Sequence, residues 1–462
     1  MSGRLLIVDS VVTNRIVLKV KLLAAKYAVT ACATRDEALG HLANDRPDLV
    51  VLSLADGPEG VLAFCRALRK DPATTGTAVI CLADDGAEGL GVAALRAGAD
   101  DVMVRPVDDA LMLARIRSLL RARNTDAEFR LRGETARVLG LAEPPGDFAR
   151  PGRVVLVAEE VTQRHDMARR VAEALGQQVI GLAPDRALAP RAMSEAPDVF
   201  IILARSGTGA AATFRLVADL RSRSDTRHAA QLVICPRDAP ELAAMALDLG
   251  VNDVATDGTE MDEIALRISS LLRRKARADQ LRASVQSGLR AAVTDPLTGL
   301  YNRRYAIPHL ASLADRARAE GRGIALMVLD IDHFKAINDT WGHAIGDAVL
   351  VGVARRLRDA LRAVDLVARI GGEEFLVAMP NTSVEQARAA AERLRITIEG
   401  QPFATLQGQP PVEVTLSIGV AMEGNDHPIT EDIEGLIARA DRALYDAKAA
   451  GRNMVTMSLS AA

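Results

Sequence analysis

The chain has 462 residues, enough for roughly three domains of ordinary size. Apolar residues make up 49% of it, which is ample for packed cores, while 57 basic against 60 acidic side chains give no electrostatic reason to expect a nucleic acid or a membrane surface as a partner. The four cysteines lie far apart, so we expect buried free thiols in a reducing compartment. No apolar run has the length of a signal peptide or a membrane span, which predicts a cytoplasmic protein.

An internal repeat organises the first 275 residues, because four blocks recur at an offset of about 150 residues. The matched blocks are RLLIV at 4 with RVVLV at 153, PDLVVL at 47 with PDVFII at 197, GADDV at 98 with GVNDV at 250, and RIRSLLR at 115 with RISSLLR at 267. Short Val/Ile/Leu runs alternate with alanine-rich helical segments in each copy. We therefore predict two doubly wound parallel α/β domains, at residues 1–124 and 152–275.

Two connecting segments follow from composition. Residues 125–151 contain EPP and GDFARPG, whose turn residues predict a linker. Residues 276–292 continue a charged segment with apolar residues near helical spacing, which predicts a helical stalk that either couples domains or pairs chains. The remaining residues, 293–462, form a third domain.

The third domain contains the stretch DLVARIGGEEFLVAM, in which two runs of strand character flank Gly371 and Gly372. A Gly-Gly link favours a hairpin because both positions can take positive φ. Glu373 and Glu374 follow at once, so the hairpin would carry two carboxylates to the edge of a sheet. The alternative is a solvated hairpin tip with two surface glutamates.

A second acidic site precedes this hairpin. The apolar run 324–329 has the length of a buried strand and ends in Asp330, Ile331 and Asp332. Beside the hairpin, Asp330 and Glu373 would provide the oxygen ligands that magnesium prefers, with the Ile331 carbonyl as a candidate third ligand. Lysine and arginine side chains suited to phosphate binding are Lys335, Lys448 and Arg452.

Five motifs of this domain together resemble the GGDEF family of diguanylate cyclases, in the same order and at similar spacing. They are DPLTGLYNRR at 295, DIDHFKAINDTWGHAIGD at 330, RIGGEEF at 369, TLSIGV at 415 and YDAKAAGRN at 445. The resemblance implies an α+β palm-like domain that holds one GTP with magnesium. It further implies a homodimer in which the 3′-hydroxyl of each GTP attacks the α-phosphate of the other, giving cyclic di-GMP and two pyrophosphates.

The resemblance also assigns roles to residues of this sequence. The implied metal ligands, for two magnesium ions per active site, are Asp330, the Ile331 carbonyl and Glu373. The implied catalytic side chains are Glu373, Lys335 and, with a lesser role in removing the proton or holding the second ion, Glu374. The implied substrate contacts are Lys335, Lys448, Arg452 and the main chain of His333 and Phe334 for the phosphates, with Asn338 and Asp347 for guanine.

These assignments have simpler alternatives. Lys448 and Arg452, four apart on one helical run, would share a helix face and could equally be a solvated helix end. Asp347 could be an N-terminal helix cap. The Asn338 and Asp347 pair fits guanine better than adenine, so ATP is the less favoured substrate.

A third site is implied by the motif RAVD, Arg362 to Asp365, which matches the RxxD inhibitory site of the family. Arg393 is placed like the arginine that completes that site. Product inhibition by cyclic di-GMP is therefore expected. Otherwise these residues would be surface charges on helices.

Each repeated copy resembles a response-regulator receiver domain, yet both depart from it where its phosphorylation chemistry resides. The five key positions hold Asp9, Ser10, Ser53, Ala83 and Arg105 in the first copy, and Ala158, Glu159, Leu203, Cys235 or its neighbour, and Asp257 in the second. Asp56 would lie in a loop. A serine hydroxyl does not replace the acceptor carboxylate.

We therefore expect two non-phosphorylated domains that position or dimerise the cyclase, with a partner protein as a candidate regulator. Two other functions compete with the cyclase: a catalytically silent cyclic di-GMP receptor and a signalling scaffold. The intact acidic residues at 330, 373 and 374 favour the enzyme.

Overall fold

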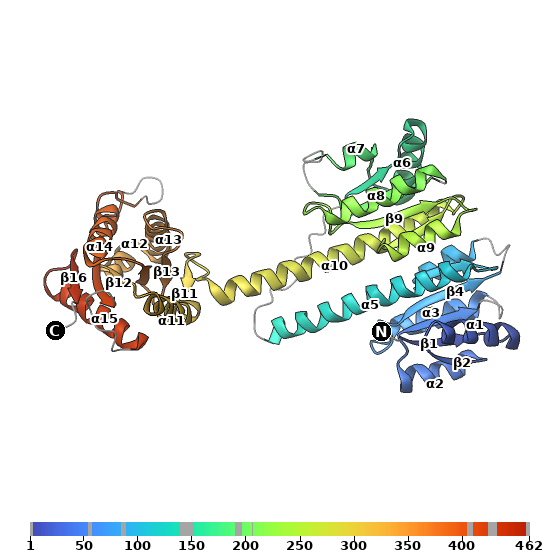
Figure 1. The fold of residues 1–462 in the computed structure, drawn as a ribbon, viewed down its shortest axis with the longest axis horizontal. Helices are drawn as coiled ribbons and strands as arrows, with labels where there is room; N and C mark the ends of the chain where they lie inside the picture. Colours follow the sequence, from blue (N-terminus) through green and yellow to red (C-terminus); the bar gives the residue numbers. More distant parts are fainter. Residues whose placement is uncertain are drawn as a thin grey trace. The chain divides into compact units, whose positions relative to one another are not determined.

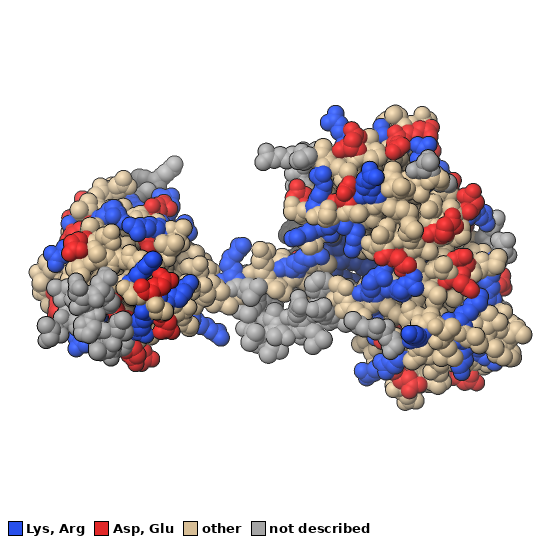
Figure 2. All heavy atoms as spheres, viewed as in Figure 1, with Lys and Arg blue, Asp and Glu red and all other residues tan. Residues whose placement is uncertain are grey.

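The computed structural model describes residues 3–53, 58–84, 89–138, 152–189, 196–205, 207–403, 410–423 and 432–458 (Figure 1). The chain divides into two compact units, Met1–Ser284 and Val285–Ala462. Both signs of charge are spread over the visible face of each unit (Figure 2), in keeping with the net charge of −3. No described helix combines the length and the apolar character that crossing a membrane requires.

The first sequence copy forms a five-stranded parallel sheet of order β2-β1-β3-β4-β5. Its strands are β1 (Arg4–Val8), β2 (Ala28–Cys32), β3 (Leu49–Ser53), β4 (Ala78–Ala83) and β5 (Asp101–Val104), and its helices are α1 (Val12–Ala24), α2 (Arg35–Asp45), α3 (Pro58–Lys70), α4 (Leu90–Ala97) and α5 (Asp109–Val138). Two separate apolar clusters pack on the two faces of this sheet. Burial on both faces explains why β4, and β3 up to Ser53, are apolar and do not alternate.

The second copy repeats this topology with the order β10-β9-β8-β6-β7. Its strands are β6 (Val154–Val157), β7 (Val179–Leu182), β8 (Val199–Leu203), β9 (Ala230–Cys235) and β10 (Asp253–Thr256), and its helices are α6 (Val161–Leu175), α7 (Pro184–Ala187), α8 (Thr208–Ser222), α9 (Pro240–Asp248) and α10 (Met261–Val293). The predicted doubly wound fold is confirmed for both copies. All four cysteines are free and buried, as expected.

The connecting segments differ in part from the prediction. Helix α5 continues to Val138, so the first half of the predicted linker, 125–138, is helical, and residues 139–151 lie outside the described residues. The turn residues that indicated a linker are concentrated in the second half of the segment. Helix α10 runs without a break through the predicted stalk, residues 276–292.

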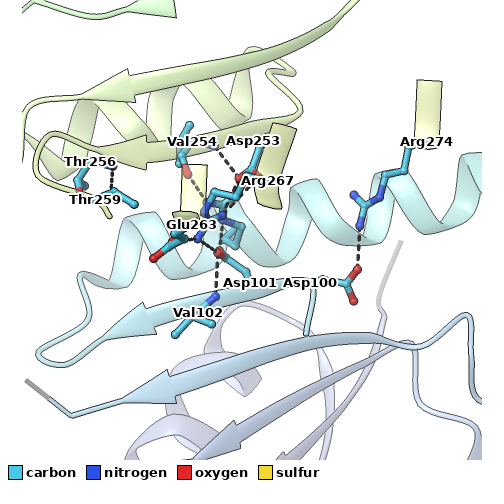
Figure 3. Close-up of polar contacts among 11 residues, drawn as sticks. Asp100, Asp101, Val102, Asp253, Val254, Thr256, Thr259, Glu263, Arg267 and Arg274 are labelled. Atoms are coloured by element: carbon cyan, nitrogen blue, oxygen red, sulfur yellow. Dashed lines mark hydrogen bonds and ion pairs between the residues drawn. The ribbon is translucent and has the colours of Figure 1, made fainter. Parts of the chain in front are cut away.

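A buried cluster of ion pairs joins the two copies within the first unit (Figure 3). Arg267 Nη2 lies 2.6 Å from Asp101 Oδ1, and Arg267 Nη1 lies 3.0 Å from Asp253 Oδ1. Arg115 contacts the same two carboxylates, and Glu263 adds a third acid at 2.8 Å from Arg267. Asp101 and Arg115 belong to the sequence blocks that repeat as Asp253 and Arg267. Each copy therefore contributes one equivalent acid and one equivalent base to a shared contact.

The second unit has a six-stranded sheet of order β11-β13-β14-β12-β15-β16, antiparallel in its centre and parallel at both edges. Its strands are β11 (Tyr301–Asn302), β12 (Ile324–Ile331), β13 (Leu366–Arg369), β14 (Glu374–Pro380), β15 (Leu416–Glu423) and β16 (Val455–Ser458), and its helices are α11 (Arg303–Ala319), α12 (Phe334–Trp341), α13 (His343–Asp359), α14 (Val384–Glu399) and α15 (Ile433–Ala449). One core cluster includes residues of α12, α13 and α14, and the other includes residues of α11 and α15. Strand β12 lies between these clusters and is buried along its whole length.

Candidate active site

The predicted hairpin is present, with β13 and β14 antiparallel and Arg369 opposite Phe375. Its turn differs from the prediction, because neither Gly371 nor Gly372 has a positive φ. Four residues, 370–373, connect the strands, so the chain reverses without the tight two-residue turn that requires positive φ. A Cβ atom at Gly371 would instead overlap the Glu374 carboxylate, which gives this glycine a steric role.

Strand β12 places Asp330 beside the hairpin. Asp330 lies opposite Glu374 of β14 in the register, and its side chain is only 6% exposed. Lys448 Nζ lies 2.8 Å from Asp330 Oδ2. Burial raises the pKa of Asp330, and the Lys448 ammonium opposes that shift. Burial and the nearby Asp330 likewise raise the pKa of Glu373. Asp330 is therefore close enough to Glu373 to disfavour the ionisation of Glu373.

These residues fit a magnesium ion. Two partly buried carboxylates with raised pKa values lack sufficient positive charge, and oxygen atoms are the donors that magnesium prefers. The main chain of Ile331 is in the same place, since its N–H donates to the Glu373 carbonyl at 3.3 Å. Among the described residues, no group of three or more His, Cys, Asp and Glu side chains has the arrangement of a metal site.

The predicted phosphate residues follow strand β12 directly. His333 is the N-terminal cap residue of α12 and has a left-handed backbone, with φ of 58°. Phe334 is buried at the first helical position, and Lys335 follows it with an exposed side chain. The main-chain N–H groups of a first helical turn have no partner within their helix. The predicted main-chain contacts and the lysine thus lie at one helix N-terminus.

The predicted guanine residues come from two helices that touch. Asn338 of α12 lies against α13 at Gly346, where a Cβ atom would overlap the Asn338 side-chain oxygen. Asp347 is the next residue and is exposed. Helix α13 begins at His343, so the alternative role of Asp347 as an N-terminal cap is wrong. The motif spans the short helix α12 and the beginning of the longer helix α13, with Asp347 inside the second helix.

Lys448 and Arg452 do not share a helix face, contrary to the prediction. Lys448 lies in the last turn of α15, whereas Arg452 follows the helix end and has a left-handed backbone with φ of 64°. Gly451, at φ of 127°, lets the chain turn away from the helix axis. The Arg452 charge still acts on Asp330, whose pKa it lowers. Both cations therefore lie near the carboxylates, but by different backbone routes.

The residues of the predicted inhibitory site lie together after α13. The Asp365 carboxylate accepts a hydrogen bond of 2.9 Å from the Arg362 main-chain N–H, and the Asp365 N–H donates to the Arg362 carbonyl at 3.0 Å. Arg393 of α14 donates to the Ala360 carbonyl at 3.3 Å. Arg362 and Asp365 thus form a turn, so the alternative of charges on a helix is wrong for this pair.

The sequence analysis missed two residues that fix the hairpin loop. Arg369 donates to the Gly372 carbonyl from Nε at 3.2 Å and from Nη2 at 2.6 Å, and its Nη1 lies 3.1 Å from Asp295. Burial alone would raise the pKa of Asp295, but hydrogen bonds from the Thr298 hydroxyl and main chain, together with Arg369, hold that pKa below its usual range. Both residues belong to recognised motifs, which was the available signal.

The carboxyl ends of the first parallel sheet hold an internal ion pair. Asp9 is buried, and its Oδ2 lies 2.8 Å from Arg105 Nη2. The same Arg105 nitrogen donates to the Ser53 hydroxyl at 3.4 Å. Asp56 lies outside the described residues. A guanidinium thus neutralises the buried carboxylate at this end of the sheet.

The corresponding end of the second sheet has both apolar and charged residues around a cavity. A cavity of about 410 Å³ has Ala158 and Leu203 in its wall, with Glu159 and Arg205 also lining it. Glu159 Oε2 pairs with Arg205 Nη1 at 3.1 Å. The two sheets thus share their topology, and the side chains at their carboxyl ends differ.

Comparisons with known proteins agree with this architecture. The model of the diguanylate cyclase GGDEF domain matches residues 292–454, and that of the response regulator receiver domain matches residues 5–117. The chain is 37% identical to the response regulator PleD of Caulobacter vibrioides over 463 residues, which cover 98% of this chain and 99% of that protein. It is 43% identical over 201 residues to the diguanylate cyclase DgcP of Pseudomonas aeruginosa, covering 42% of this chain and 29% of that protein.

Among solved structures, the coiled coil and GGDEF domain of DgcB from Caulobacter crescentus, in complex with c-di-GMP, is similar at 32% identity and a TM-score of 0.37. The match covers 41% of this chain and 98% of that chain. Identity to PleD over almost the whole of both chains establishes the family. The chain therefore belongs to the PleD-like response regulators, which combine receiver and GGDEF domains, and it is a diguanylate cyclase.

Proposed function

We propose that two copies of this chain condense two GTP molecules to cyclic di-GMP, each GGDEF domain holding one GTP. The observation that carries the site assignment is the meeting of Asp330, Glu373 and Lys448 at the carboxyl end of the central strand β12. A single domain holds one nucleotide, so a homodimer is needed to bring a 3′-hydroxyl to the α-phosphate of the other GTP. The proposed domains are residues 1–124, 152–275 and 293–462, as predicted from the sequence. Helix α5 extends beyond the first of these domains to Val138.

Asp330, Glu373 and the Ile331 carbonyl would hold magnesium, which when bound supplies charge neutralisation for the triphosphate and lowers the pKa of the attacking hydroxyl. Lys335 and Arg452 bind phosphate oxygens from the α12 N-terminus and from the turn after α15. Lys448 is neutralised by Asp330 in the absence of substrate and turns to the triphosphate when GTP is present.

The remaining site residues orient the base and move the proton. Asn338 and Asp347 accept hydrogen bonds from the guanine N1 and N2 hydrogens, with Asn338 supported against Gly346. Glu374, opposite Asp330 in the sheet, accepts the proton of the 3′-hydroxyl or supports a second ion. The Arg369 contact with Gly372 keeps the loop of Glu373 in place.

The test compares wild-type protein with Glu373→Gln at several protein concentrations, following pyrophosphate and cyclic di-GMP from GTP and magnesium. We expect Glu373→Gln to lose at least 100-fold in kcat, because an ionised ligand becomes a neutral one (on the order of 3 kcal/mol). Glu434→Gln, an exposed change in the first turn of α15, is the matched control. Wild-type activity should rise more steeply than linearly with protein concentration. Equal rates for Glu373→Gln and wild type would show that the site is misassigned.

The turn at Arg362 and Asp365, with Arg393, is proposed as a product-binding site that inhibits the cyclase. Its support is the proximity of Arg393 to Ala360, two residues before Arg362, and the presence of c-di-GMP in the similar DgcB structure. Arg362→Ala should raise the inhibition constant for cyclic di-GMP without changing the KM for GTP. An unchanged inhibition constant would remove this assignment.

Both receiver domains are proposed to act without phosphorylation, as regulatory or dimerising scaffolds open to control by a partner protein. The support is Ser53 in place of the acceptor carboxylate, and Arg105 paired with the remaining acid, Asp9. In the second domain, Ala158 and Leu203 occupy the corresponding strand ends. Stoichiometric aspartyl modification after incubation with acetyl phosphate would contradict this proposal.

A further inference from the structure

A second acidic residue follows strand β12 and has a contact network of its own. Asp332 is 5% exposed, and its Oδ1 accepts a hydrogen bond of 2.6 Å from the Ser417 hydroxyl. Its Oδ2 accepts two more, from the Thr415 hydroxyl at 2.8 Å and from the main-chain N–H of Asn453 at 3.0 Å. Both oxygens of this buried carboxylate are therefore directed to β15 and to the turn after α15. Asp332 is thereby distinguished from its neighbour Asp330, whose partner is Lys448.

The turn that Asp332 contacts has an unusual backbone. Gly451, Arg452 and Asn453 have φ values of 127°, 64° and 47°, three left-handed residues in succession. Residues other than glycine rarely adopt this backbone region, and they do so where the surrounding structure holds them there. The Arg452 N–H donates to the Ala447 carbonyl at 3.1 Å, and the next N–H, that of Asn453, donates to Asp332. The carboxylate thus stabilises the end of this turn directly.

The side chain of Asn453 attaches the same turn to helix α14. Its Nδ2 donates to Glu399 Oε1 at 2.8 Å, and its Oδ1 accepts from Arg395 Nη1 at 3.0 Å. Asparagine tolerates a left-handed backbone better than most residues. Asn453 is therefore held by its main chain to Asp332 and by its side chain to α14, immediately beyond Arg452.

We propose that Asp332 and Asn453 are positioning residues that hold Arg452 toward the substrate phosphates, and that Asp332 is not a metal ligand. This inference rests on the proposed role of Arg452 in phosphate binding. A guanidinium binds phosphate through a rigid fork of N–H donors. The contribution of Arg452 to GTP binding therefore depends on the direction in which its backbone points the side chain. Without the two attachments, the three left-handed residues would relax and Arg452 would lose that direction.

The test is a double-mutant cycle of Asp332→Ala and Arg452→Ala, with KM for GTP, kcat and the magnesium concentration for half-maximal activity as readouts. Arg452→Ala should raise KM about tenfold, the scale of one charge-assisted contact. Asp332→Ala should raise KM by a similar factor, and the double variant no further than Arg452→Ala alone. At saturating GTP the magnesium requirement of Asp332→Ala should equal that of wild type.

Conservative variants provide independent readouts. In Asp332→Asn the amide oxygen can still accept a hydrogen bond from the Asn453 N–H. The amide NH2 group then faces the Ser417 hydroxyl, which can accept a hydrogen bond where it donated one before. The KM of Asp332→Asn should therefore be close to that of wild type. Asn453→Gly keeps the left-handed backbone and removes both contacts with α14. It should raise KM when Arg452 is present and leave KM unchanged when it is combined with Arg452→Ala. This variant tests the proposal even if Asp332→Ala does not fold.

Asp432→Ala is the matched control for stability. It removes the N-terminal cap of α15, whose carboxylate accepts from the Gly435 N–H at 2.9 Å, at the helix end remote from Lys448. We expect it to lower the melting temperature and leave KM unchanged.

Three outcomes would overturn the inference. An equal KM increase from Asp332→Ala in the Arg452→Ala background would show that Asp332 acts independently of Arg452. A raised magnesium requirement for Asp332→Ala would make it a metal ligand. A wild-type KM for Arg452→Ala alone would refute the phosphate role proposed for Arg452, and the positioning role would fall with it.

Discussion

Replacement of Arg267 by alanine tests the ion-pair cluster that joins the two parallel α/β domains. The Arg267 side chain is 4% exposed and lies 2.6 Å from Asp101, 3.0 Å from Asp253 and 2.8 Å from Glu263. Its removal leaves the two buried aspartates with Arg115 as their remaining partner in the cluster. Breaking a buried ion pair by removing one partner costs about 3–5 kcal/mol, because a charge stays buried without compensation.

The pKa shifts in this cluster have the same physical origin. Burial alone would raise the pKa of Asp253, but the guanidinium groups of Arg267 and Arg115 outweigh burial and hold it below its usual range. Burial alone would lower the pKa of Arg267, and Asp101 with the other acids raises it well above its usual value. A depressed carboxyl pKa contributes stability that is present above the unfolded-state value of about 3.9 and is lost as the pH falls through the folded-state value. The effect of Arg267→Ala is therefore fully developed at pH 7.

Arg117→Ala is the control, since Arg117 belongs to the same helix as Arg115 and pairs with Asp248 of the second domain at 2.7 Å. That pair is 41% and 47% exposed, so its removal should cost no more than about 1 kcal/mol. Hydrogen exchange of the Val102 and Val254 amides, which donate to Asp101 and Asp253, reports the local opening free energy. Equal losses for Arg267→Ala and Arg117→Ala would refute the argument from burial.

Two further predictions concern the active site. The pKa values of Asp330 and Glu373 are raised, so the acidic limb of the pH profile of kcat/KM should lie above the ordinary carboxyl range. Lys448→Met removes a cation that lowers both pKa values, so it should move that limb to higher pH. A shift of the limb to lower pH would contradict the assignment. Gly346→Ala should raise KM for GTP about fivefold, because the added methyl group displaces the Asn338 side chain. The melting temperature should stay level or rise, because alanine favours helix. A wild-type KM for this variant would exclude the contact between Asn338 and guanine.

Local patterns predicted most of the architecture. The repeat of four blocks indicated two related parallel sheets, and both have the same strand order. The hairpin was predicted from strand runs on either side of two glycines, and its register places Glu374 opposite Asp330. Its turn was predicted wrongly, because glycine permits a positive φ without requiring one, and loop length decided the geometry.

Contacts between distant segments could not be predicted in the same way. In the sequence, Asp332 is an acid two residues after the expected metal ligand Asp330, and only its contacts with Thr415, Ser417 and Asn453 reveal its different environment. Arg369 and Asp295 stood in separate motifs, 74 positions apart, and their ion pair at the hairpin loop depends on the pairing of β11 with β13.

The sequence by itself determined which segments become strands and helices and that the first two domains are copies. It also indicated which side chains could bind magnesium, phosphate and guanine. These features are readable because periodicity and residue chemistry are properties of neighbours along the chain. The tertiary structure decided which of the two acids at positions 330 and 332 faces Lys448 and which faces a turn. It also decided where Arg452 leaves its helix, and how equivalent aspartates and arginines of the two copies meet. Those outcomes depend on burial and on partners far apart in sequence, whose energies arise only when the sheets and helices are packed.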